Sequence, residues 1–147
     1  MGSDPLFTKS VKRGSDPLCV HADVLAELRA HARAEAPREC CGLLLGTTER
    51  IARSVRARNI APGATRYLID PEDHFSAIRA ARMEGLDVIG AYHSHPSGEP
   101  VPSATDIAEA NSGPEFVYVI VSAGSGEARA YRFEEGRPRE LALQTEA

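Results

Sequence analysis

Two histidines stand two residues apart at the end of an apolar run. Residues 88–93 predict a buried strand, and His93-Ser94-His95 closes it. Because side chains alternate between the two faces of a strand, both imidazoles point to the same face. Two imidazoles on one face are well suited to binding one zinc ion.

A serine and a carboxylate follow this pair at short range. After an irregular loop over residues 96–102, Ser103 begins a predicted helix and Asp106 lies in its first turn. The loop is short enough for the start of the helix to fold back over the end of the strand. His93, His95 and Asp106 would then supply three ligands and leave a fourth position for water, which is the pattern of a catalytic zinc.

Simpler interpretations stand beside this one. Ser103-x-x-Asp106 is also the pattern of a helix capping box, with Asp in place of Glu. Glu99, in the connecting loop, is a rival carboxylate ligand. The remaining histidines lie in or beside predicted helices and are interpreted as structural or exposed: His21, His31 and His74.

With these residues the sequence resembles the JAMM (MPN+) metalloprotease family. The signature of that family is an upstream Glu, then His-x-His, seven residues, Ser, two residues and Asp. Four residues fit this spacing: His93, His95, Ser103 and Asp106. Glu39 matches the upstream Glu, since it precedes Cys-Cys-Gly and an apolar strand. The resemblance covers roughly residues 18–143 and points to the compact stand-alone prokaryotic type.

The resemblance implies a role for each signature residue. His93, His95 and Asp106 ligate zinc. Glu39 contacts the zinc-bound water, acts as general base and passes the proton to the leaving amine. Ser103 donates a hydrogen bond to the oxyanion of the tetrahedral intermediate. These roles suit amide hydrolysis, which needs an activated water, a proton carrier and a donor to the developing negative charge.

The same resemblance implies a substrate class. Small members of this type process ubiquitin-like or sulfur-carrier proteins, so we expect hydrolysis of the amide bond after a C-terminal Gly-Gly. One alternative is a non-catalytic MPN-type interaction module with structural zinc or no zinc. Another is a zinc-dependent nucleobase deaminase, but that class uses His-x-Glu and Cys-x-x-Cys, which this sequence lacks.

Composition and charge argue against two classes of partner, nucleic acids and membranes. The 147 residues predict one domain, and the net charge of −4 with interspersed signs gives no electrostatic case for nucleic acid or an anionic membrane. No apolar run approaches the roughly 18 residues of a membrane span. We therefore expect a cytoplasmic protein, monomeric or homodimeric, with neither nucleic acid nor a membrane as its partner. That its partner is another protein is implied by the family resemblance.

Three cysteines, two of them adjacent, do not suggest a disulfide framework. Cys41 is interpreted as a small buried residue at the start of a strand. Cys40, next to the candidate base, is a candidate reactive thiol that could compete for zinc.

The elements that must position these residues alternate between helix and strand. Helices are predicted over residues 22–36, from an Asp70 cap to Gly85, and from Ser103 to about residue 113. Strands are predicted over residues 41–46, 51–59, 67–69, 88–93, 116–122, 127–133 and 140–143. The second helix is expected to bury an apolar side made of Phe75, Ile78, Ala81 and Met83.

The predicted fold is therefore a single α/β domain with a mixed central sheet flanked by helices on both faces. The family resemblance implies the JAMM/MPN architecture, which is similar to that of cytidine deaminases. Residues 1–17 contain Gly-Ser-Asp-Pro-Leu, which recurs from Gly14, and we interpret them as an expression tag or cloning scar. Residues 18–143 form the predicted domain, and residues 144–147 a frayed tail.

Overall fold

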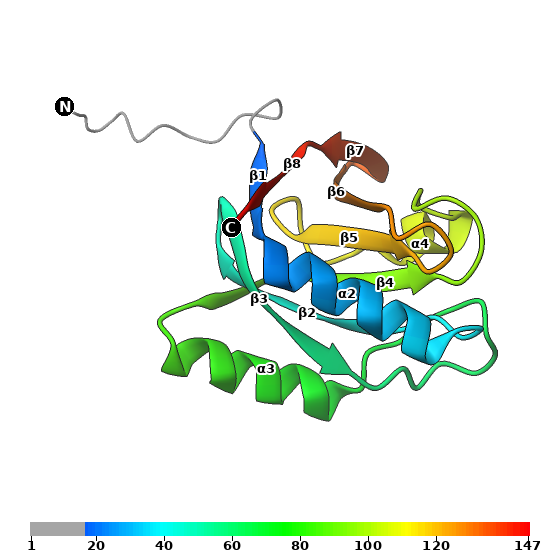
Figure 1. The fold of residues 1–147 in the computed structure, drawn as a ribbon, viewed down its shortest axis with the longest axis horizontal. Helices are drawn as coiled ribbons and strands as arrows, with labels where there is room; N and C mark the ends of the chain where they lie inside the picture. The colour runs from blue at the N-terminus through cyan, green and yellow to red at the C-terminus, as the bar shows by residue number, and fades with distance from the viewer. Residues whose placement is uncertain (1–16) are drawn as a thin grey trace.

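An eight-stranded mixed sheet organises residues 17–147, the part of the chain that the computed structural model describes. The strands lie in the order β7-β6-β5-β4-β2-β3-β1-β8. Their bounds are β1 Leu18–His21, β2 Cys41–Thr47, β3 Arg50–Ala57, β4 Asp87–His95, β5 Val117–Ser122, β6 Ala128–Glu134, β7 Arg137–Leu141 and β8 Leu143–Glu146. The pairs β4–β5, β1–β3 and β1–β8 are parallel and the others antiparallel, which confirms the predicted mixed α/β sheet (Figure 1).

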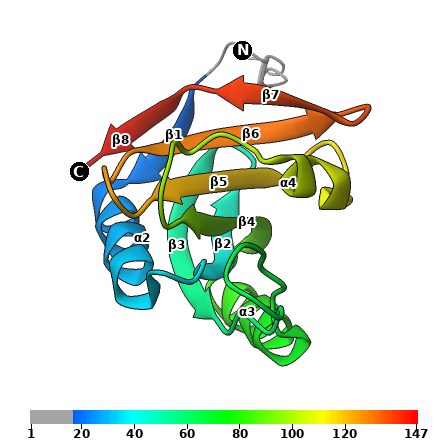
Figure 2. The same ribbon diagram turned by 90° about the vertical axis from the view of Figure 1, so that its right-hand side faces the viewer.

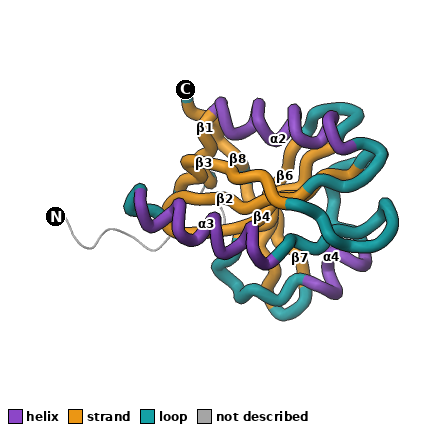
Figure 3. Tube along the Cα trace, turned by 90° about the horizontal axis from the view of Figure 1, so that it is seen from below, coloured by secondary structure: helices purple, strands orange, loops and turns teal. Residues whose placement is uncertain are grey.

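Helices cover both faces of the sheet. The described helices are α2 (Ala22–Glu35), α3 (Pro71–Met83) and α4 (Ala104–Glu109). In Figure 3 the sheet lies between α2 on one side and α3 and α4 on the other. Strand β2 shows how the sequence serves both faces, because Leu44 packs into the core under α2 while Leu43 and Leu45 pack with residues of α3. A continuous apolar run is therefore the expected pattern for this strand.

Strand β4 lies in the middle of the sheet, between β2 and β5 (Figure 2). Its last residues include His93, which lies opposite Cys41 of β2, and His95, which lies opposite Ser122 of β5. The strand therefore runs two residues beyond its predicted end. Tyr92 packs into the α2-side core and Ala91 into the α3-side core, so the alternating histidines face the α3 and α4 side. Neighbouring strands on both sides thus fix the position of both imidazoles.

Three predicted elements differ from the structure. The predicted strand at residues 67–69 is wrong, because in the part of the chain that the structure describes this segment makes only one isolated bridge, between Ile69 and Asn59. Helix α4 ends at Glu109, since the backbone of Ala110 is already extended. The predicted strand at residues 140–143 is divided between β7 and β8, which turn the chain from one edge of the sheet to the other.

The predicted apolar side of α3 is right for Ala81, which is buried, and wrong for Phe75 and Met83. Phe75 and Met83 are 63% and 88% exposed. The residues that α3 buries are Ala77 and Ala81, one turn apart. Small side chains let the helix axis approach the sheet closely, whereas larger ones at the helix margins are left facing solvent.

The end of the chain belongs to the sheet rather than to a tail. The prediction of a frayed tail at residues 144–147 is wrong, because residues 143–146 form β8 and pair with β1 over its whole length. Strand β1 itself was not predicted as a strand. Residues 1–16 of the predicted tag lie outside the described residues. None of the helices in residues 17–147 is long and apolar enough to cross a membrane.

Candidate metal centre

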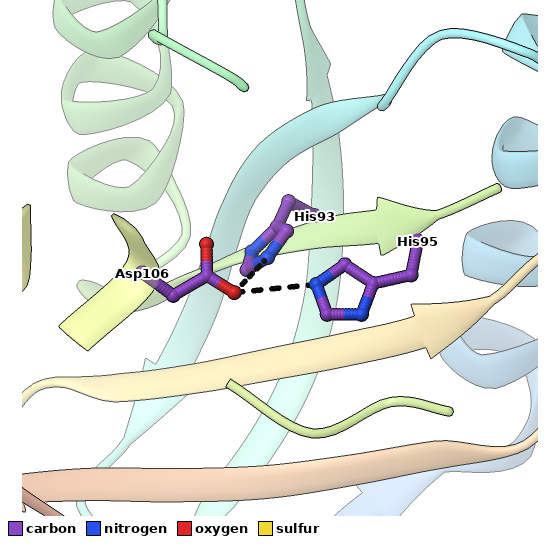
Figure 4. A group of neighbouring side chains, drawn as sticks. All are labelled: His93, His95 and Asp106. Atoms are coloured by element: carbon purple, nitrogen blue, oxygen red, sulfur yellow. Dashed lines mark hydrogen bonds and ion pairs between the residues drawn. The ribbon is translucent and has the colours of Figure 1, made fainter. Parts of the chain in front are cut away.

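The structure brings His93, His95 and Asp106 together on the α4 side of β4. One ligand atom from each lies within 4.8 Å of the other two. Asp106 Oδ2 is 3.1 Å from His93 Nε2 and 3.2 Å from His95 Nε2, and Figure 4 shows both rings turned toward this oxygen. The predicted ligand set is therefore one spatial cluster, built by the end of a strand and the start of a helix.

A capping box orients the carboxylate of this cluster. The Ser103 hydroxyl oxygen accepts from the Asp106 backbone N–H at 3.0 Å, and Asp106 Oδ2 accepts from the Ser103 N–H at 2.9 Å. The side chain of Asp106 is thereby folded back along the first turn of α4, toward the histidines. The capping interpretation of this motif is confirmed, and capping is also the means by which Asp106 reaches the site.

A backbone contact fixes the orientation of the His95 ring. Its Nδ1 lies 2.9 Å from the carbonyl oxygen of Glu99, which can only accept a hydrogen bond. Nδ1 therefore carries the proton, and in the neutral ring the Nε2 lone pair faces Asp106. Glu99 contributes this carbonyl, and its carboxylate is not part of the cluster, so the rival-ligand interpretation is not supported.

The resulting donor set fits a metal cation. A carboxylate oxygen faces the Nε2 atoms of both histidines, and contacts at these distances need either a proton on each imidazole or a cation between the three groups. The hydrogen bond to Asp106 raises the pKa of His95, whereas burial lowers the pKa of His93. Burial opposes ionisation of Asp106, yet hydrogen bonds from both histidines hold its pKa well below the usual range. Two imidazoles and one carboxylate are a ligand set that zinc accepts.

Glu39 lies beside the cluster in a poorly solvated position. Its residue is 7% exposed, and its Oε1 is buried with no hydrogen-bond partner among the described residues. Burial, followed by the nearby charge of Asp106, raises the pKa of Glu39 to about 7. Glu39, His95 and Ser103 line one cleft of about 700 Å³. A carboxyl group that titrates near neutral pH is suited to accept and release protons.

An aromatic ring that the sequence analysis missed covers His93. The ring of Tyr67 stacks on the imidazole with centroids 4.3 Å apart and an interplanar angle of 17°. Burial raises the pKa of this tyrosine, which is therefore neutral. A lone tyrosine in an irregular segment has no pattern that could have announced this contact.

Both adjacent cysteines are buried structural residues. Cys40 is 1% exposed and Cys41 is fully buried. Burial raises the pKa of their thiols to about 11 and about 12. The interpretation of Cys41 as a packing residue is confirmed, and that of Cys40 as a reactive thiol is wrong, because reactivity requires the thiolate. Neither belongs to the metal cluster.

Comparison with known proteins places the chain in a sequence family. The family described as prokaryotic homologs of the JAB domain matches residues 21–134. The chain is 38% identical over 141 residues to the desampylase of Haloferax volcanii, covering 90% of this chain and 99% of the relative. It is 40% identical over 127 residues to the "Probable TtuB-protein conjugate cleaving protease" of Thermus thermophilus, covering 86% and 81%. It is 35% identical over 126 residues to the CysO-cysteine peptidase of Mycobacterium tuberculosis, covering 81% and 84%.

Solved structures share the fold. A protein of Desulfitobacterium hafniense superimposes with a TM-score of 0.79 at 25% identity, over 88% of this chain and 92% of that one. A JAB1/MPN domain protein of Archaeoglobus fulgidus superimposes with a TM-score of 0.60 at 18% identity, over 90% and 100%. The second comparison shows the MPN fold, as the sequence resemblance implied.

Proposed function

The chain belongs to the family of prokaryotic JAB/JAMM (MPN) domain proteins, and from this premise we propose that it is a zinc-dependent peptidase of protein conjugates. Its proposed reaction is hydrolysis of the amide bond after the C-terminal Gly-Gly of a ubiquitin-like or sulfur-carrier protein. Relatives named for cleaving TtuB–protein conjugates and for CysO-cysteine peptidase activity support this substrate class. The observation that carries the proposal is the convergence of three ligand atoms within 4.8 Å beside the carboxylate of Glu39, whose Oε1 has no hydrogen-bond partner among the described residues.

His93, His95 and Asp106 would hold the zinc ion. When bound, zinc lowers the pKa of water to roughly 7 and polarises the scissile carbonyl. The Glu99 carbonyl keeps the proton on Nδ1 of His95 and so leaves Nε2 free to ligate. Tyr67 shields one face of the His93 ring and limits its solvation.

Glu39 is proposed as the general base. In the metal-free protein, burial raises its pKa to about 7. The carboxylate would take a proton from the attacking water and then deliver that proton to the nitrogen of the leaving amine. Because Oε1 has no partner among the described residues, no existing hydrogen bond must break before the carboxylate accepts the proton.

Ser103 is proposed as the donor to the oxyanion of the tetrahedral intermediate. Its oxygen accepts the capping bond from Asp106, so its O–H proton remains available to donate into the shared cleft. Loss of such a donor typically costs about 10²–10³ in rate.

The cleft beside these groups suits a narrow extended peptide. Besides the site residues, small side chains and prolines line it: Ala36, Pro37, Ala64, Thr65, Pro96 and Ser97. Two successive glycines lack Cβ atoms and can approach backbone closely. A Gly-Gly tail would therefore enter with fewer clashes than other sequences.

A matched pair of substrates tests the proposal. A sulfur-carrier protein extended past Gly-Gly, and the same protein extended past Gly-Ala, are incubated with the zinc-loaded protein and followed by intact-mass spectrometry. We expect cleavage after the second glycine only. Equal cleavage of both would contradict the Gly-Gly assignment, and no cleavage of either would favour a binding role.

A further inference from the structure

The peptide group that joins Glu39 to Cys40 is held by side chains at both of its polar atoms. It precedes β2, which begins at Cys41, so the sheet does not account for these bonds. The Glu39 carbonyl accepts from Nδ2 of Asn59 at 2.9 Å, and the Cys40 N–H donates to Oγ of Ser94 at 2.8 Å. Because a peptide group is planar, two bonds on opposite sides of it fix the orientation of the whole unit.

Ser94 connects this peptide directly to the metal-binding strand. It stands between the two histidines, is fully buried, and its own N–H donates to the Cys40 carbonyl at 3.1 Å. Cys40 and Ser94 therefore exchange two hydrogen bonds, one of them through a side chain. A change that removed the Ser94 hydroxyl would leave the buried Cys40 N–H without its partner.

Asn59 connects the same peptide to the segment that covers His93. Its Nδ2 donates to the carbonyls of Glu39 and Arg66, and its Oδ1 accepts from the N–H groups of Ala61 and Leu68. Each of these side-chain donors and acceptors is engaged, at 2.9–3.0 Å. Two of these partners, Arg66 and Leu68, flank Tyr67, whose ring stacks on the imidazole of His93. A single amide thus links the backbone of the base to the aromatic cover of a ligand.

We propose that Asn59 and Ser94 are positioning residues that clamp the 39–40 peptide and so set the place of the Glu39 carboxylate relative to the metal ligands. This inference rests on the proposed function, because it assigns their effect to proton transfer by Glu39. The side chain of Glu39 gives physical reason for such a clamp. Its Oε1 has no partner among the described residues, so the backbone must supply the order that the carboxylate lacks.

Two variants release one end of the clamp each. Ser94→Ala removes the acceptor for the Cys40 N–H. Asn59→Asp keeps an acceptor for the two N–H groups and removes the donors to Glu39 and Arg66. We expect kcat to fall about 10–100-fold in each, with KM and zinc content within about twofold of wild type, because misplacement of a reacting group by about 1 Å has costs of this size. Ser122→Ala is the matched control, since Ser122 is also buried but its hydroxyl accepts from the backbone N–H of Ser125 in a turn.

A second measurement tests the hydrogen bonds of the clamp directly and does not depend on catalytic turnover. Amide hydrogen exchange of Cys40, measured by NMR on the metal-free protein, should accelerate in Ser94→Ala and remain slow in Ser122→Ala. Wild-type kcat in the Ser94→Ala variant, unchanged exchange of the Cys40 amide, or zinc loss that parallels the loss of activity would each overturn the clamp. Failure of the wild-type protein to cleave any Gly-Gly substrate would instead refute the proposed function, and the positioning role with it.

Discussion

A hydrogen bond at Nδ1 orients the His95 ring, on the side opposite to Nε2, the proposed ligand atom. Its Nδ1 donates to the Glu99 carbonyl, which leaves Nε2 directed at Asp106. A ligand whose tautomer and rotation are both fixed loses little freedom when a metal binds. The chemistry of the centre therefore depends on single atoms, and single-residue changes should separate metal binding from proton transfer.

Removal of one imidazole should abolish the metal site. We expect His95→Ala to bind no zinc and to show no turnover, because two remaining ligands do not complete a tetrahedral site. Zinc content is measured by atomic absorption after dialysis. His74→Ala removes an exposed histidine of α3 and should leave both properties unchanged. A His95→Ala variant with full zinc content would contradict the assigned ligand set.

The raised pKa of Glu39 predicts that the neutral substitution Glu39→Gln increases the free energy of unfolding by an amount that depends on pH. In the metal-free protein its pKa is about 7, above the ordinary 4.5, so between these values the native state keeps a proton that the unfolded state has lost. The free energy of unfolding of wild type therefore falls as pH rises through this window. The glutamine of Glu39→Gln does not titrate. The free energy of unfolding of this variant should therefore exceed that of wild type by an amount that grows from pH 4.5 to pH 7 and then levels off, at about 1–3 kcal/mol.

Urea denaturation in the presence of a chelator measures this difference at pH 5 and pH 8. Glu99→Gln provides the background expected from removing one exposed surface charge. An advantage of Glu39→Gln that stays constant with pH would contradict the raised pKa.

In helix α4 one residue, Ser103, has both a structural role and a proposed catalytic role. Ser103 caps the helix and is also the proposed oxyanion donor. Ser103→Gly separates these roles, because glycine at an N-cap costs only a few tenths of a kcal/mol but supplies no hydroxyl. We expect kcat to fall about 10²–10³-fold with little change in melting temperature. Ser103→Thr keeps both functions and should retain activity, whereas equal activity in Ser103→Gly would exclude a donor role.

Strand β2 depends on a glycine directly opposite Tyr92. A Cβ at Gly42 would lie 2.3 Å from the tyrosine ring and 2.4 Å from the Val55 carbonyl oxygen. We expect Gly42→Ala to lower the free energy of unfolding by about 1–3 kcal/mol or more, since one of the clashing atoms is backbone. Gly124→Ala is the matched control, because a Cβ there meets nothing closer than 3.9 Å. Chemical denaturation of both variants compares the two; equal stability would contradict the close packing.

The elements that were predictable from sequence are those with a strong local signal. Helix α2 has apolar spacing, α3 has an Asp70 cap followed by proline, and β4 is an apolar run. Residues 67–69 looked like a strand because they are apolar and aromatic, but within residues 17–147 they make a single bridge, to Asn59. Strand β8 was missed because its pairing with β1 joins distant parts of the chain and leaves no local pattern.

The same distinction applies to the site. The types and spacing of His93, His95 and Asp106 carried enough chemistry to predict the cluster, whereas Glu39 was selected only through the family resemblance. Asn59 and Ser94 were not predicted as contributors. Their hydrogen bonds cross 20 and 54 residues of sequence, and an asparagine or serine alone does not indicate what it will contact.

For the whole molecule, the site joins elements from across the sequence. Its residues come from the segment before β2, from β4 and from α4, so a metal ion at the centre would bind the folded state and not the unfolded chain. Binding of this kind stabilises by about 4 kcal/mol when free zinc is about 1,000 times its Kd. We expect a chelator to lower the melting temperature of wild type but not of His95→Ala. An equal decrease in both would indicate an effect unrelated to this centre.

The central claim is that one metal ion and Glu39 act together to cleave a protein conjugate. The most direct test returns zinc in steps to the metal-free protein while cleavage of a carrier extended past Gly-Gly is followed by intact mass. Wild type should gain activity in proportion to zinc up to one equivalent, and Glu39→Gln should bind the same equivalent without cleaving. Cleavage by metal-free wild type, or by zinc-loaded Glu39→Gln at a comparable rate, would contradict the account.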